Sequence, residues 1–78
     1  MKTLIIGSQG SGKTLLARAL AEHLTAGGRM VRLLELDGPE HARMPGVVYD
    51  DEIHVVRLPT GVDIAGYDRV ITICGGPM

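Results

Sequence analysis

The chain has 78 residues, a formal net charge of −1, one cysteine and neither tryptophan nor phenylalanine. A chain of this length makes one small domain that buries about 60–65% of the surface of the unfolded chain. The charge gives no basic field for a nucleic acid, no apolar run reaches the roughly 18–20 residues of a membrane span, and one cysteine excludes an internal disulfide. We therefore expect a single domain over residues 1–78, cytoplasmic, without a membrane or nucleic-acid partner.

A phosphate-binding motif lies near the start of the chain. An apolar run at residues 3–6 predicts a buried strand, and a Leu- and Ala-rich stretch at 15–26 predicts a helix with Leu16, Leu20 and Leu24 on one face. Between them the chain fits the Walker A pattern G-x-x-x-x-G-K-[ST] with the residues Gly7, Ser8, Gln9, Gly10, Ser11, Gly12, Lys13 and Thr14. Strand, loop and helix come in the order that the motif requires.

The spacing of the motif matches the chemistry of phosphate binding. Gly7, Gly10 and Gly12 allow the backbone to curl with its N–H groups pointing inward, and the start of the helix adds further N–H groups. Lys13 would reach the β- and γ-phosphates, and the Thr14 hydroxyl would bind Mg²⁺. The motif predicts a nucleotide site with Mg²⁺, and our leading hypothesis is that the nucleotide is ATP more than GTP. The alternative is a glycine-rich turn that binds nothing.

The rest of the chain predicts three further strands. The helix should end at Gly27-Gly28, since glycine takes the left-handed position after a helix. Residues 30–36 then predict a second strand, parallel to the first in a right-handed unit, and 53–58 and 69–74 predict a third and a fourth. We expect an α/β fold, a minimal P-loop NTPase-like, mostly parallel four-stranded sheet in the order strand–helix–strand–strand–strand, with one main helix.

The connections predict little regular structure. Residues 38–51 read as loop with a helical turn near 40–43, the acidic run 50–52 reads as a solvated loop face, and 60–68 is too short and broken for a crossover helix. A single helix covers one face of a sheet, whereas parallel sheets are normally covered on both. Either the loops cover the second face, or a protein partner does; a homodimer is our expectation.

Two acidic residues follow the second strand. Glu35 and Asp37 are two apart and so point to one face, at the carboxyl end where ligands bind in open α/β sheets. With Lys13 they are the candidate catalytic residues, and Asp37 with Thr14 the candidate Mg²⁺ ligands, because phosphoryl transfer needs a held metal or an oriented water. Alternatively, Glu35 is an edge charge and Asp37 a turn former before Gly38.

With these segments placed, the chain resembles the ParA/MinD family of P-loop ATPases. The likeness rests on four stretches, at residues 7–14, 28–40, 53–59 and 67–77. The second has that family's strand with an acidic-x-acidic ending before proline, and the fourth is similar to its Tyr-Asp lead-in, apolar strand and closing motif. The resemblance implies a nucleotide and Mg²⁺ on Lys13 and Thr14, acidic roles for Glu35 and Asp37, and a nucleotide-linked dimer.

The departures from that family bear on activity. Ser8 stands where the family has a lysine that reaches the partner's nucleotide, and Cys74 stands where it has the acid that holds the Mg²⁺ water. We therefore expect weak hydrolysis or none. Two alternatives remain: a non-catalytic regulatory or interaction module that retains the loop, and a small-molecule kinase, since Leu36-Asp37-Gly38 with Arg43 resembles a phrase of adenylylsulfate kinases. Arg43 and Arg57 are either phosphate-facing or surface arginines.

Overall fold

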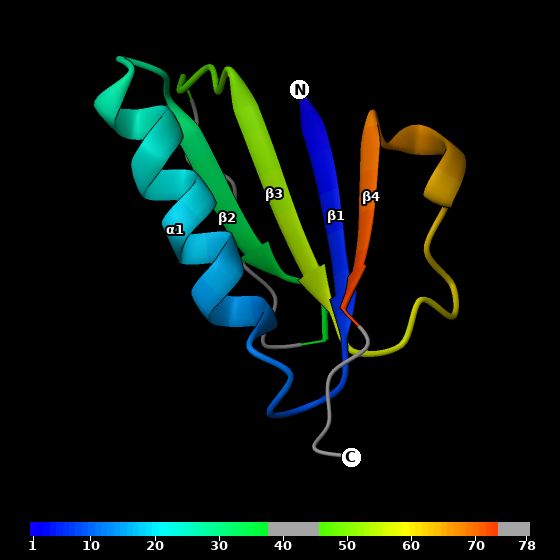
Figure 1. Cartoon of the computed structure of the whole chain (residues 1–78). Coiled ribbons are helices and arrows are strands. Elements are labelled where there is room, and N and C mark those ends of the chain that lie inside the picture. The colour runs from blue at the N-terminus through cyan, green and yellow to red at the C-terminus, as the bar shows by residue number, and fades with distance from the viewer. Residues whose placement is uncertain (38–45, 74–78) are drawn as a thin grey trace.

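The computed structural model describes residues 1–37 and 46–73, and within them the strands form one four-stranded, fully parallel sheet (Figure 1). The elements are β1 Lys2–Gly7, α1 Lys13–Ala26, β2 Val31–Glu35, β3 Asp51–Val56, the short 3₁₀ helix η1 Ile64–Gly66 and β4 Arg69–Ile73. The strand order is β2-β3-β1-β4, so β1 lies inside the sheet and pairs with β3 on one side and β4 on the other. The predicted α/β fold with one main helix is confirmed.

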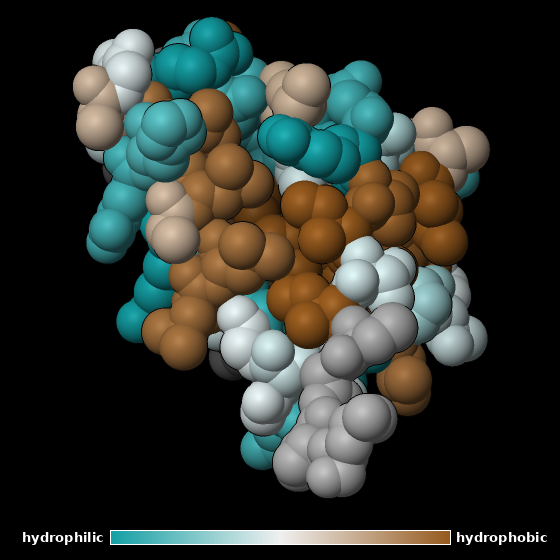
Figure 2. Space-filling model, in the orientation of Figure 1, coloured by the Kyte–Doolittle hydropathy of each residue, from teal (hydrophilic) through white to brown (hydrophobic). Residues whose placement is uncertain are grey.

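Helix α1 covers one face of the sheet and makes the main core. Ile5, Ile53 and Val55 point to this face from the two central strands and pack with Ala17, each at most 1% exposed. Figure 2 shows further apolar side chains gathered beside α1 on the same face, over β1, β3 and β4. Leu20 and Leu24 of the predicted leucine row pack against this core, whereas Leu16 is 40% exposed and Ala17 is the fully buried residue of α1.

The turn after α1 forms as its glycines predict. Gly28 has a φ of 85°, its N–H donates to the carbonyl of Thr25 at 2.9 Å, and the N–H of Arg29 donates to the carbonyl of Leu24 at 3.2 Å. These two bonds form a Schellman motif, which satisfies carbonyl groups left open at the end of a helix. The turn directs the chain from the end of α1 to the start of β2. No helix in the described part of the chain has the length and apolar character of a membrane span.

The third strand begins earlier than predicted. It runs over 51–56 and not 53–58, so Arg57 and Leu58 lie beyond it. The prediction that 50–52 is a solvated loop face is wrong for Asp51 and Glu52, which begin β3; Asp51 is 6% exposed and Glu52 is half-buried. The predicted loop at 60–68 contains only the turn of η1. The predicted helical turn near 40–43 lies outside the described residues.

Asp51 can begin β3 as a buried carboxylate because cationic groups from distant parts of the chain neutralise its charge. Asp51 forms an ion pair with the Arg29 guanidinium, and its other oxygen lies 3.4 Å from the N-terminal ammonium group. The hydrogen bond from Arg29 holds the pKa of the Asp51 carboxyl below its usual value, against the opposing effect of burial. Sequence pattern alone has no access to these partners, which explains the incorrect prediction.

Neighbouring carboxylates bind backbone N–H groups at the same edge. Asp50 accepts the N–H of Met30 at 2.8 Å, and Asp68 accepts the N–H of Lys2 at 2.7 Å. The carbonyl of Lys2 in turn accepts the N–H of Asp68 at 2.8 Å. The amino-terminal ends of the strands are thus connected to one another by carboxylates.

The face of the sheet opposite α1 contains a buried histidine. His54 is 8% exposed, its Nδ1 lies 2.7 Å from the Tyr67 hydroxyl, and its Nε2 lies 4.0 Å from the Glu52 carboxylate. The direction of the hydrogen bond between Nδ1 and the Tyr67 hydroxyl depends on the histidine tautomer, and Nε2 has no hydrogen-bond partner among the described residues. Burial raises the pKa of Tyr67, so its hydroxyl keeps its proton. Tyr67, which follows η1, therefore covers part of the second face of the sheet.

We predict that Asp51→Asn lowers the melting temperature by about 4–8 °C at neutral pH, because the Arg29 guanidinium and the N-terminal ammonium lose their anion. A carboxyl whose folded pKa is lowered stabilises the fold above the unfolded pKa, and this stability is lost as pH falls through the folded value. Thermal unfolding from neutral to acidic pH measures both effects. The control is Glu22→Gln, on the exposed side of α1; equal behaviour of the two variants contradicts the prediction.

We predict that His54 makes the fold less stable as pH falls below about 6.5. Burial lowers the pKa of His54 in the folded chain. As the pH falls, the histidine is therefore protonated in the unfolded chain before it is protonated in the folded chain. Lys2 and Arg32 oppose the added charge and Glu52 favours it, with burial the largest effect. Urea unfolding at about pH 7.5 and about pH 5.5 tests this, with His54→Gln expected to show a smaller loss. His23→Gln, exposed on α1, serves as control, and an unchanged loss in His54→Gln refutes the prediction.

Candidate functional site

The loop between β1 and α1 presents unpaired backbone donors. Gly10 and Gly12 have φ values of 82° and 87°, a left-handed conformation in which a side chain is strained. Gly12 is the N-cap of α1, and this end of the helix has neither a side-chain cap nor an acidic residue in its first turn, judged on the described residues. A helix start with free N–H groups and the positive end of the dipole attracts anions.

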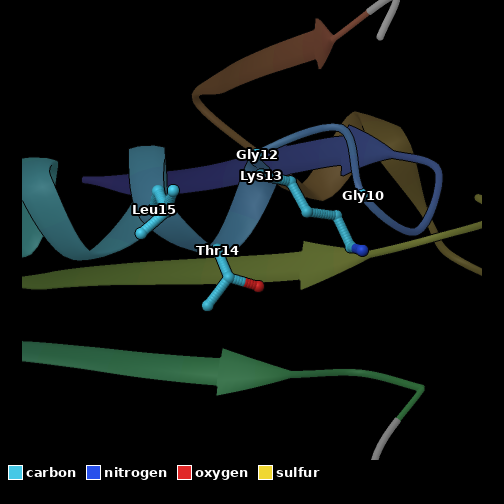
Figure 3. A pocket seen from close by; sticks show the side chains of 5 residues that line it. All are labelled: Gly10, Gly12, Lys13, Thr14 and Leu15. Atoms are coloured by element: carbon cyan, nitrogen blue, oxygen red, sulfur yellow. The ribbon is translucent and has the colours of Figure 1, made fainter. Parts of the chain in front are cut away.

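The same loop forms an open pocket of about 280 Å³. It is lined by Gly10, Gly12, Lys13, Thr14 and Leu15 (Figure 3). The Lys13 side chain runs back along the loop toward Gly10, and the Thr14 oxygen is turned toward the carboxyl end of β3. The pocket therefore joins one ammonium group, one hydroxyl and the N-terminus of α1, a donor set that fits phosphate.

Close packing within the loop explains the first glycine of the motif. A Cβ atom at Gly7 would lie 2.4 Å from Ser11 Oγ and 3.3 Å from the Cβ of Lys13. Ser11 Oγ is buried and has no hydrogen-bond partner among the residues that the structure describes. This hydroxyl can donate one hydrogen bond and is free to do so within the described chain. Glycine at position 7 is a steric requirement.

The remaining predicted loop residues are placed at the rim. Ser8 and Gln9 are exposed, and the carbonyl of Ser8 accepts the N–H of Ser11 at 3.1 Å to form a turn. Neither residue lines the pocket. They contribute to the curvature of the loop, and their backbone groups remain candidates for ligand contact.

The two predicted acids lie at the carboxyl edge of the sheet but do not line the pocket. Glu35 ends β2, is exposed, and pairs with Val55, which places it on the face that α1 covers. Asp37 is also exposed, and its Oδ2 accepts the N–H of Arg57 at 3.0 Å. The pocket thus brings together Lys13 and Thr14, while Glu35 and Asp37 stand two strands away from β1 in the sheet order.

Two features of the site escaped the sequence analysis. Leu15 lines the pocket although it is 72% exposed, whereas its apolar character had suggested only a helix position. The backbone N–H of Arg57 donates to the Asp37 carboxylate just after β3. The sequence analysis missed this bond because it placed Arg57 inside the strand. No cluster of three metal-ligating side chains occurs within residues 1–37 and 46–73, and Arg43 and Cys74 lie outside those ranges.

Loop, pocket and parallel sheet together define a P-loop nucleotide-binding domain. Residues 3–61 match the sequence model of the AAA family, described as the ATPase family associated with various cellular activities. The chain belongs to this family, and the matched range includes the whole phosphate loop and β3. Neither a curated protein nor a solved structure matches the chain.

We predict that Gly7→Ala destabilises the domain by about 1–3 kcal/mol, because the new methyl group collides with Ser11 Oγ. Ser11→Ala should be neutral or stabilising, since it removes a buried hydroxyl without a partner in the described chain. The double variant should recover part of the loss. Urea unfolding of the three variants forms a double-mutant cycle, and strictly additive free energies rule out the proposed collision.

Proposed function

We propose that this domain binds a nucleoside triphosphate, ATP in preference to GTP, with Mg²⁺, and that by itself it hydrolyses the nucleotide weakly or not at all. The observation that carries the proposal is the loop of residues 7–14, in which two left-handed glycines and an uncapped helix start lie beside the Lys13 ammonium group. Membership of an ATPase family supports it.

Each loop group has a distinct part in binding. The backbone N–H groups from Gly7 to Thr14 would surround the phosphates, Lys13 would neutralise their charge, and the Thr14 hydroxyl would hold Mg²⁺. The metal would supply charge neutralisation on the phosphate oxygens. Asp37 is the candidate acid for the metal or its water through Oδ1, because Oδ2 is bonded to the N–H of Arg57.

Weak hydrolysis follows from the placement of the acids. Attack by water needs a side chain that orients the water against the phosphate. Glu35 and Asp37 are the acids proposed for this task, and both lie outside the pocket lining. A site of this kind holds a nucleotide more readily than it cleaves one. The closer likeness to ParA/MinD proteins and a homodimer remain part of the proposal, with light scattering in the presence of ATP as their test.

We predict that Lys13→Ala weakens ATP binding at least tenfold, since it removes the ammonium group from the pocket. Calorimetric titration with ATP and with GTP, each with Mg²⁺, measures this on wild type and variant. Arg18→Ala is the matched control, because Arg18 is an exposed cation farther along α1. Wild-type affinity in Lys13→Ala, or no binding by the wild type, defeats the proposal; phosphate release on the same samples gives the hydrolysis rate.

A further inference from the structure

Arg57 leaves the sheet beside the start of the phosphate loop. β1 and β3 are neighbours, with Ile6 opposite Val56 as their last pair. The next residues along the two strands are Gly7, where the loop begins, and Arg57. Neighbouring strands lie about 4.8 Å apart where they pair, so Arg57 follows a strand that lies next to the one from which the loop begins. Residues 57 and 58 form a bend, so the chain turns out of the sheet directly after this last pair.

The backbone at Arg57 is held in place by β2. The N–H of Leu36 donates to the carbonyl of Val55 at 2.9 Å, and the next residue, Asp37, accepts the N–H of Arg57 at 3.0 Å. These bonds continue the contact between the two strands past their formal ends. The carboxylate of Asp37 therefore fixes the point from which the Arg57 side chain extends.

The Arg57 guanidinium group forms no ion pair with the residues that the structure describes. Its side chain is exposed, whereas Arg29 and Arg32 pair with Asp51 and Glu52. Lys13 is the cation in the pocket lining; Arg57 lies outside that lining, after the strand next to β1, so only its long side chain could extend to a bound phosphate chain. A triphosphate carries several negative charges, and a guanidinium group binds phosphate with paired hydrogen bonds on a long side chain.

We propose that Arg57 is a second phosphate-binding cation of this site, complementary to Lys13, and that Asp37 is its positioning residue. The inference rests on the proposed function, because both concern the same bound nucleotide. In this proposal Asp37 acts by holding the backbone of Arg57, which does not require a metal ion. The guanidinium group meets the phosphate chain from the β3 side of the loop, while Lys13 meets it from α1.

The test is ATP affinity in wild type and variants, measured with Mg²⁺ and with the metal chelated. Arg57→Gln should bind ATP about 10- to 100-fold more weakly in both conditions, and Arg57→Lys should recover part of the loss. Arg18→Gln is the matched control, an exposed arginine on α1 that should bind like wild type. Thermal unfolding of each variant checks that its fold is intact.

The Asp37 variants separate positioning from metal binding. Asp37→Asn keeps an oxygen that accepts the Arg57 N–H and should bind metal-free ATP more tightly than Asp37→Ala does. Asp37→Ala loses that acceptor and should match Arg57→Gln, and the double variant Asp37→Ala with Arg57→Gln should lose no more than either one. An additive double loss, or equal metal-free affinity of Asp37→Ala and wild type, overturns the role of Asp37.

The outcomes also separate this inference from the proposed function. If the wild type binds ATP and Lys13→Ala does not, the nucleotide site stands; wild-type affinity of Arg57→Gln then overturns the role of Arg57 alone. If the wild type binds no nucleotide, both proposals fall. A loss in Arg57→Gln that Arg18→Gln shares assigns the effect to general surface charge and also overturns the inference.

Discussion

The pairing of β1 on both sides is the constraint on which the site depends. β1 is bonded to β3 and to β4 along its length, and Leu4 and Ile5 within it have no exposed surface. One of these side chains faces away from α1 and the other packs toward it. A strand held at both edges and on both faces ends at a fixed point. The loop that follows it therefore starts from a rigid base, which phosphate binding by backbone groups requires.

The two ends of the sheet use charge in opposite ways. At the amino-terminal end the carboxylates of Asp50, Asp51 and Asp68 are bound by backbone N–H groups, by the N-terminal ammonium group or by Arg29. At the carboxyl end Lys13 and the uncapped start of α1 line the pocket, and the acids Glu35 and Asp37 lie outside that lining. The pocket end therefore presents donors that a ligand can bind.

The sequence was informative where a residue type determines the local backbone. The glycines of the loop, the left-handed Gly28 and the aliphatic strands were predictable, because each follows from sterics or from burial period. The start of β3 was not, because Asp51 depends on Arg29, which lies 22 residues away. For the same reason, the two-residue spacing predicted that Glu35 and Asp37 share a face of the sheet, but it could not predict that Asp37 accepts the N–H of Arg57. Long-range polar partners set the limit of prediction.

The connection from β3 to β4 is held at three separate places. Arg57 is bonded at the carboxyl edge, Tyr67 contacts His54 on the face away from α1, and Asp68 is bonded at the amino-terminal edge. Residues 57–68 thus form a tether that runs the length of the sheet with both ends attached to strands. Exposed connections usually open at a low free energy, and each of these attachments opposes opening at its own place. The N–H groups of Arg57 and Asp68 are both hydrogen-bonded, so their hydrogen exchange would report separately on the carboxyl and amino-terminal ends of the sheet.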